Sequence, residues 1–203
     1  MNLCTRLCIG TLSAGAVLGL GASANAAIIN FGQITTNGPV NISGQIEVEL
    51  EEVGAEVHFT VRNLGPITSS VANIYIDDAP GLLGSLLGMI NGSGVNLIAG
   101  GGTGPDNLPG WDGMGITADF NAGAAAPPPG NGINPGEWAT MRLSMVGSFS
   151  DIVAAMTSGS MMFGAHVISV GDAGASESIM TPTPGAAALM GIAGLCAARR
   201  RRE

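Results

Sequence analysis

The sequence predicts an all-β protein, a single antiparallel β-sandwich of jelly-roll-like type with one short helix. Three observations support this class. Residues 41–63 alternate between apolar and polar side chains with period two, which is typical of strands that bury one face. Residues 91–137 are dense in glycine and proline, which predicts loops rather than strands. Residues 27–184 contain no cysteine, so a domain of this length must rely on an apolar core without disulfides.

The clearest predicted elements are two strands joined by a turn near Glu51 and Glu52. The pattern fits two antiparallel strands with one face buried and one in water, because a helix would need apolar residues at three- and four-residue spacing. In the first strand Ile42, Ile46, Val48 and Leu50 share one face, and Gln45, Glu47, Glu49 and Glu51 share the other. In the second strand Val53, Ala55, Val57, Phe59 and Val61 share one face, and Glu56, His58, Thr60 and Arg62 share the other.

Six further segments have strand-like composition, which gives seven or eight short strands in one domain. We expect Asp77 and Asp78 to end the strand that begins near residue 70. The single helix is predicted at 151–156, with Ser150 as its N-cap. The additional strand segments are 27–34, 70–78, 115–120, 138–145, 161–170 and 175–180.

Residues 1–26 have the layout of a secretory signal peptide. A short region carrying Arg6 precedes an uncharged stretch at 9–22, and the small residues Ala24 and Ala26 predict a cut after Ala26. The apolar stretch is shorter than the roughly 20 residues that a spanning helix needs. A lipoprotein with Cys8 as the acylated residue is the alternative, but the three residues before Cys8 are not the small apolar set expected there.

The other end of the chain is a predicted membrane-spanning tail. An uncharged run of 13 residues, 186–198, leads directly into Arg199, Arg200, Arg201 and Arg202. Arginines at the edge of an apolar helix prefer the cytoplasmic side, so they would halt translocation with the body of the protein outside. Even counted from Pro182 the run has 17 residues, about the lower limit for a spanning helix. This length favours a temporary anchor, and a plain tail anchor is the alternative.

The tail resembles the PEP-CTERM sorting signal of exported Gram-negative proteins, which a membrane protease called an exosortase recognises. The motif residues are Pro182, Thr183, Pro184 and Gly185, followed by the short apolar helix and the arginine cluster. Thr183 stands where the commonest form has glutamate. The resemblance divides the chain into a signal peptide (1–26), a β-sandwich ectodomain (27–180) and a sorting signal (181–203).

The body also resembles a type of ectodomain found among PEP-CTERM proteins. The stretches that carry this resemblance are FTVRNLGPITSSVANIYIDD, NGINPGEWATMRLSM and GAHVISVGDAGASES. The family that it suggests has no assigned enzymatic activity, so the resemblance implies a fold and an extracellular location rather than a mechanism. Its processing partners would be signal peptidase and exosortase, with transient membrane anchoring through the tail.

The charge of the body excludes some partners. Of the 15 acidic residues only Glu203 lies outside residues 27–184, and of the 7 basic residues only Arg62 and Arg142 lie inside, which leaves a net charge of −12 and no lysine. Nucleic acid and anionic lipid both need a basic footprint, so we expect neither as a partner.

The sequence contains no recognisable catalytic set. The Gly-x-Ser-x-Gly motif of a nucleophile elbow does not occur. His58 and His166 lack the local spacing of a zinc site, so we expect His58 at the surface and His166 in a structural role. No cofactor is predicted, although loop carboxylates are suitable ligands for calcium. The calcium candidates are Asp77 with Asp78, and Asp106 with Asp112, which can equally be ordinary turn aspartates.

Three functions follow from these observations. The first is a non-enzymatic cell-surface or extracellular-matrix protein, associated with exopolysaccharide or biofilm. The second is a carbohydrate-binding adhesin, with or without calcium, that uses the loops around Trp111. Trp111 and Trp138 are the candidate sugar platforms, and burial at the end of the core is the competing interpretation of Trp111. The third is a secreted hydrolase with an acidic site, ranked last because sequence alone does not place any two carboxylates at a productive separation.

Overall fold

The computed structural model describes residues 25–181 and confirms a mostly β protein with antiparallel sheets. Eleven strands, two α-helices and two 3-10 helices make up this part of the chain. In chain order they are β1 (Ala26–Asn30), β2 (Gly32–Gln33), η1 (Ser43–Gln45), β3 (Ile46–Val53), β4 (Glu56–Asn63), β5 (Ser70–Asp77), β6 (Leu83–Asn91), β7 (Leu97–Ala99), η2 (Asp112–Met114), β8 (Phe120–Ala124), α1 (Pro128–Asn131), β9 (Trp138–Met145), α2 (Phe149–Ser158), β10 (Met162–Val170) and β11 (Ala175–Met180).

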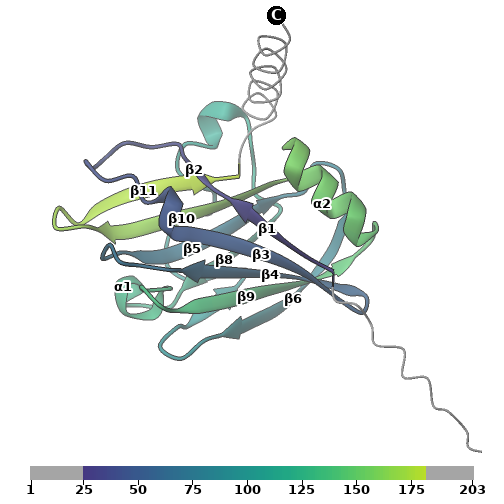
Figure 1. The fold of residues 1–203 in the computed structure, drawn as a ribbon, viewed down its shortest axis with the longest axis horizontal. Coiled ribbons are helices and arrows are strands. Elements are labelled where there is room, and N and C mark those ends of the chain that lie inside the picture. Colours follow the sequence, from purple (N-terminus) through teal and green to yellow (C-terminus); the bar gives the residue numbers. More distant parts are fainter. Residues whose placement is uncertain (1–24, 182–203) are drawn as a thin grey trace, which may run out of the picture.

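The strands form two antiparallel sheets, shown in Figure 1. The five-stranded sheet has the order β1-β3-β4-β9-β6, and the six-stranded sheet has the order β2-β11-β10-β5-β8-β7. Strands β3 and β4 form a hairpin, but β4 and β9 pair across a large separation in sequence. The outward faces of β4 and β9 therefore combine residues from distant parts of the chain.

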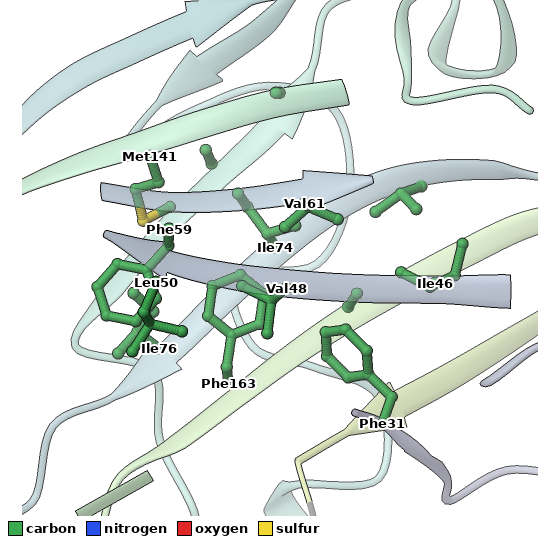
Figure 2. Packing of buried hydrophobic residues seen from close by; sticks show 14 of the residues in the cluster. Phe31, Ile46, Val48, Leu50, Phe59, Val61, Ile74, Ile76, Met141 and Phe163 are labelled. Atoms are coloured by element: carbon green, nitrogen blue, oxygen red, sulfur yellow. The ribbon is translucent and has the colours of Figure 1, made fainter. Parts of the chain in front are cut away.

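The apolar core lies between the two sheets. Phe59 of the five-stranded sheet stacks on Phe163 of the six-stranded sheet, with ring centroids 5.7 Å apart. Phe31 meets the edge of the same Phe163 ring at 5.9 Å. Figure 2 shows Val48 and Ile74 packed in the same cluster. Each large apolar side chain buried in this way contributes about 1.5–3 kcal/mol, so the cluster that joins the sheets stabilises their face-to-face packing.

The β3–β4 hairpin is confirmed, but its turn lies later than predicted. Strand β3 continues through Val53, which pairs with Glu56, and the turn is the two residues Gly54 and Ala55. Gly54 adopts a φ of 63°, a left-handed conformation that costs glycine little and that two-residue hairpin turns require. The expected burial of Val53 and Ala55 is wrong, because both lie at the exposed end of the hairpin and Val53 is 42% exposed.

The predicted outward position of Gln45 is also wrong. Gln45 lies in η1, which interrupts the strand alternation, and its side chain is 6% exposed. Its Nε2 donates to Asn63 Oδ1 at 2.7 Å, to the carbonyl oxygen of Ile67 at 2.7 Å and to Ser69 Oγ at 3.0 Å. A buried amide is stable only when it is hydrogen-bonded, and this network satisfies it.

The predicted helix is confirmed as α2, but its N-cap is Ser148 rather than Ser150. Ser148 Oγ accepts a hydrogen bond from the backbone N–H of Asp151, and the Asp151 carboxylate accepts one from the backbone N–H of Ser148. This reciprocal capping box satisfies two backbone donors that the first turn would leave free. The structure adds one unpredicted short helix, α1, in the Gly- and Pro-rich region.

The strands predicted at 138–145 and 175–180 are confirmed as β9 and β11, and those at 70–78 and 161–170 as β5 and β10. The strand predicted at 115–120 is largely wrong, because β8 begins only at Phe120. The predicted number of strands, seven or eight, is lower than the eleven found in residues 25–181. The prediction missed β6 entirely, and it assigned β7 and β8 to the loops between residues 91 and 137.

One long loop covers part of the outer face of the six-stranded sheet. In this covering loop, residues 105–118, Leu108 and Trp111 pack with Tyr75 of β5 and Met180 of β11 in a second apolar cluster. The first seven residues of β5 are buried, with Tyr75 beneath this loop and Ser70 and Asn73 in contact with residues outside it. Within residues 25–181 no helix is long and apolar enough to cross a membrane. The predicted spanning segment, 186–198, lies outside the residues that the structure describes.

Candidate functional site

The outer face of the five-stranded sheet carries a continuous array of polar side chains. In the register of β4 and β9, His58 lies opposite Arg142, Thr60 opposite Thr140, and Arg62 opposite Trp138. The alternate residues on both strands, such as Phe59 and Met141, point into the core, so these side chains point outward. We call this array the polar face, and it comprises Glu47, Glu49, Glu51, Glu56, His58, Thr60, Arg62, Trp138, Thr140 and Arg142.

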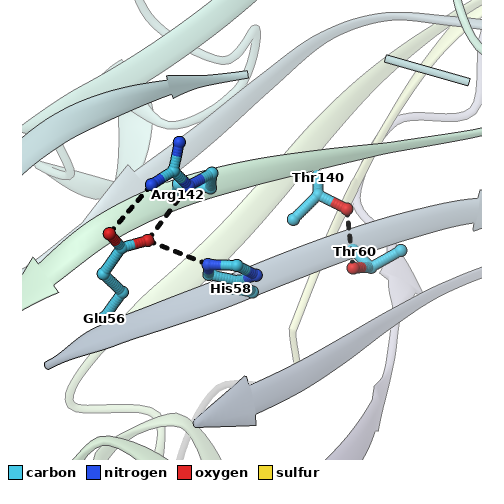
Figure 3. Close-up of polar contacts among 5 residues, drawn as sticks. All are labelled: Glu56, His58, Thr60, Thr140 and Arg142. Carbon is cyan, nitrogen blue, oxygen red and sulfur yellow. Dashed lines mark hydrogen bonds and ion pairs between the residues drawn. The ribbon is translucent and has the colours of Figure 1, made fainter. Parts of the chain in front are cut away.

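Glu56 is the centre of one half of the polar face (Figure 3). Arg142 binds it through two parallel hydrogen bonds, Nε to Oε2 at 3.0 Å and Nη2 to Oε1 at 2.8 Å. His58 Nε2 lies 2.9 Å from the same Oε2 atom. The hydrogen bond from Arg142, followed by that from His58, lowers the pKa of Glu56. Both partners therefore stabilise the ionised form of Glu56. Their hydrogen bonds also hold the three side chains in one arrangement.

The other half of the polar face contains Arg62, which bridges two glutamates of β3. Its Nη2 atom lies 3.1 Å from Glu49 Oε2, and its Nε atom lies 4.0 Å from Glu47 Oε1. Thr60 Oγ1 and Thr140 Oγ1 form a hydrogen bond of 2.8 Å between the two halves. Both arginines of the described chain are therefore held by carboxylates on this face.

Trp138 lies at the edge of the polar face and is partly exposed. One side of its indole packs against Gly92, where an added Cβ would come within 3.2 Å of the ring atoms Cε2 and Nε1. Glycine at position 92 therefore leaves room for the ring, which a larger residue would displace. An aromatic ring held beside hydrogen-bonding groups is a combination suited to binding a ligand that is partly apolar and partly polar.

The structure does not support Trp111 as an exposed sugar platform. Its side chain is 0% exposed and lies 6.2 Å, centroid to centroid, from the ring of Tyr75. Gly164 gives it room, because a Cβ there would approach the Trp111 ring at 2.7 Å. The competing interpretation, a tryptophan that covers the core, is confirmed, and Trp138 remains as the partly exposed tryptophan.

The two candidate calcium pairs lie in different parts of the fold, Asp77 with Asp78 at the end of β5 and Asp106 with Asp112 in the covering loop. Asp78 is 8% exposed, and its two carboxylate oxygens accept the backbone N–H groups of Leu82 and Leu83, as expected for a turn aspartate. Asp77 ends β5, and its pKa is raised by burial and then by the neighbouring charges of Asp119 and Asp78.

The other two candidates lie in the covering loop. Asp106 and Asp112 are both exposed, and Asp112 Oδ1 accepts a hydrogen bond from Asn107 at 2.6 Å. Sequence reasoning missed Asp119, whose carboxylate accepts the backbone N–H of Asp78 at 2.7 Å. Within residues 25–181 no group of three or more His, Cys, Asp or Glu side chains is arranged to hold a metal ion.

The two histidines lie on different sheets. His58 shares its face with Glu56 and Thr60, as its sequence pattern predicts. His166 is on the outer face of the six-stranded sheet, where Nε2 is 2.6 Å from Ser176 Oγ, and its buried Nδ1 has no hydrogen-bond partner among the described residues. Burial lowers the pKa of His166, which fits the structural role expected from its position.

The predicted processing residues lie at or beyond the ends of the described chain. Ala26 is the first residue of β1 and pairs with Glu51. Ala24 lies outside residues 25–181, and so do Pro182, Thr183, Pro184, Gly185, Arg199, Arg200, Arg201 and Arg202. Comparisons with known protein families, with curated proteins and with solved structures each found no match to the chain.

Proposed function

We propose that the chain is an exported, non-enzymatic cell-surface or extracellular-matrix protein, associated with exopolysaccharide or biofilm and sorted by an exosortase. The observation that carries this proposal is the position of the two sequence signals relative to the fold. The strands run from Ala26 to Met180, so the sorting motif follows the last strand and the predicted leader overlaps the sheets only at Ala26, the first residue of β1. Signal peptidase and exosortase are the processing partners in this proposal, and the tail anchors the protein only until it is cut.

The proposed cut after Ala26 falls at the start of the first strand. Removal of residues 1–26 would break the ladder pair of Ala26 with Glu51 and the contacts of Asn25 with Glu52. The remaining four residues of β1, 27–30, keep their pairing with β3. The proposed cut therefore shortens the first strand by one residue and leaves its other four pairs with β3. We also propose that the two packed sheets form a jelly-roll-like β-sandwich ectodomain.

Intact-mass spectrometry of the protein recovered from its native host tests the proposal. We expect a mass that begins at residue 27 and ends near the motif 182–185, with any attached group added. A variant with the four terminal arginines changed to alanine should keep its tail, whereas Glu203→Gln should be processed normally. Recovery of the wild-type chain from the cytosol with both ends intact would contradict the proposal.

The polar face favours a second candidate function, a carbohydrate-binding adhesin. Its ordered hydrogen-bonding groups lie beside a partly exposed tryptophan, in an arrangement suited to a sugar chain. This candidate does not depend on calcium or on the loop around Trp111.

A further inference from the structure

We propose that the polar face binds a neutral, hydroxyl-rich polysaccharide, with Trp138 packed against the apolar side of a sugar ring. Arg142, Glu56 and Arg62 would hydrogen-bond the hydroxyl groups. This inference rests on the adhesin role proposed above and assigns it a site and a ligand class. Three features of the structure support it: the hydrogen bonds among the side chains of the polar face, the position of Trp138 and the local charge.

The two sheets differ in what lies on their outer faces. The six-stranded sheet is covered in part by residues 105–118, whose side chains Leu108 and Trp111 pack over Tyr75 and Gly164. On the five-stranded sheet, the outward side chains of β4 and β9 belong to neither apolar cluster of the described chain. The polar face is therefore the sheet surface on which an extended ligand can lie.

The polar face is already ordered in the absence of a ligand. Arg142 is held by two hydrogen bonds to Glu56, and Thr60 is bonded to Thr140 across the strands. Because these rotamers are fixed on strands rather than on loops, binding would cost little side-chain entropy. A guanidinium has five N–H donors, more than the contacts of Arg142 and Arg62 with their carboxylates use, and a hydroxyl group can both accept from such a donor and donate to Glu49 or Glu56.

The local charge selects among polysaccharides. Two arginines and four glutamates lie on the polar face, and each arginine lies beside at least one of the glutamates, so with His58 neutral the face carries a small negative charge. The whole body, residues 27–184, carries −12. An anionic polymer such as alginate would be repelled by this field, whereas a neutral polymer needs no counter-charge. The paired arginines leave no free cation to attract a polyanion.

Affinity electrophoresis of the exported protein in gels that contain a single polysaccharide tests this inference. The probes are neutral dextran, mannan and hydroxyethyl cellulose, the anionic polymer alginate and the amino polymer chitosan. We expect retardation by at least one neutral polymer and none by alginate. Trp138→Ala and Arg62→Gln should each weaken binding at least tenfold, and Trp111→Phe, a matched aromatic change on the opposite sheet, should leave it unchanged.

Each other outcome would overturn the inference. These outcomes are no retardation by any neutral polymer, preferential binding of chitosan or alginate, and binding that is equally strong in Trp138→Ala. Thermal unfolding of each variant shows whether weaker binding comes from a changed polar face or from an unfolded protein. Arg62→Gln keeps the test valid if Trp138→Ala does not fold. Because processing is measured by mass on the same preparation, failure of sugar binding is distinguishable from failure of the proposed export and sorting.

Discussion

Replacing Trp111 with alanine should destabilise the protein strongly although the residue lies in a Gly- and Pro-rich loop. The side chain is 0% exposed and packs with Tyr75, Leu108 and Met180 on the outer face of the six-stranded sheet. Truncation of a buried tryptophan removes its transfer free energy and leaves a cavity, which together cost about 3–5 kcal/mol. A domain of this size has about 5–15 kcal/mol of total stability, so the variant should lose a large share of it.

The matched variants make the prediction specific. Trp111 Nε1 is buried and has no hydrogen-bond partner among the described residues, so Trp111→Phe removes an unsatisfied donor and should cost less than Trp111→Ala. Met114 is 50% exposed in the same loop, and Met114→Ala should change stability by less than about 0.5 kcal/mol. Urea unfolding followed by circular dichroism measures all three. A cost below about 1 kcal/mol for Trp111→Ala would refute the covering role of the loop.

Three further predictions follow from individual contacts. Ser148→Ala should cost about 1 kcal/mol in urea unfolding and Ser150→Ala clearly less, because Ser148 caps α2. Burial lowers the pKa of His166 in the folded protein. As pH falls below about 6.5, the unfolded chain therefore takes up a proton at His166 before the folded protein does, and the free energy of unfolding should decrease. His166→Gln should reduce the difference in Tm between pH 7.5 and 5.5, and an unchanged difference would contradict this assignment. Burial and neighbouring carboxylates raise the pKa of Asp77, so the ionised side chain destabilises the fold at pH 7. Asp77→Asn should therefore raise Tm at pH 7, but not at a pH below 3.8, the ordinary pKa of an aspartate, where the side chain is protonated in both states.

The local sequence pattern was sufficient to predict strands that have one apolar face and one polar face. The stretches that became β4, β9 and β11 alternate or have β-rich composition, and their predicted positions are close to the observed ones. Strand β6 was missed because its residues, LGSLLGMIN, mix glycine with apolar side chains and lack a polar face. Its pairing with β9 is irregular near Leu86 and Gly88, and a period-two pattern does not describe an irregular strand.

Tertiary contacts decided the structure of the Gly- and Pro-rich region. Glycine is favoured there for close packing as well as for turns. A Cβ at Gly123 would come within 2.3 Å of Asn73 Nδ2, and one at Gly102 would meet the backbone of Gly123 at 2.2 Å. These glycines allow the loop after β7 to lie against β8 and β5. Composition predicts loops in such a region but does not indicate which residues pair or which tryptophan is buried.

The polar face shows why a candidate site on a sheet is only half visible in a sequence. Alternation places Glu56, His58 and Thr60 on one face of a strand, and this was predicted correctly. Their partners Thr140 and Arg142 lie on β9, and the register that joins them to β4 is set by burial of Phe59 against Met141 on the opposite face. A shift of one residue would turn Arg142 into the core and bring Met141 to the surface. The apolar core therefore determines the geometry of the polar face, and a substitution that disturbs the core register should abolish the proposed sugar binding without changing a polar residue.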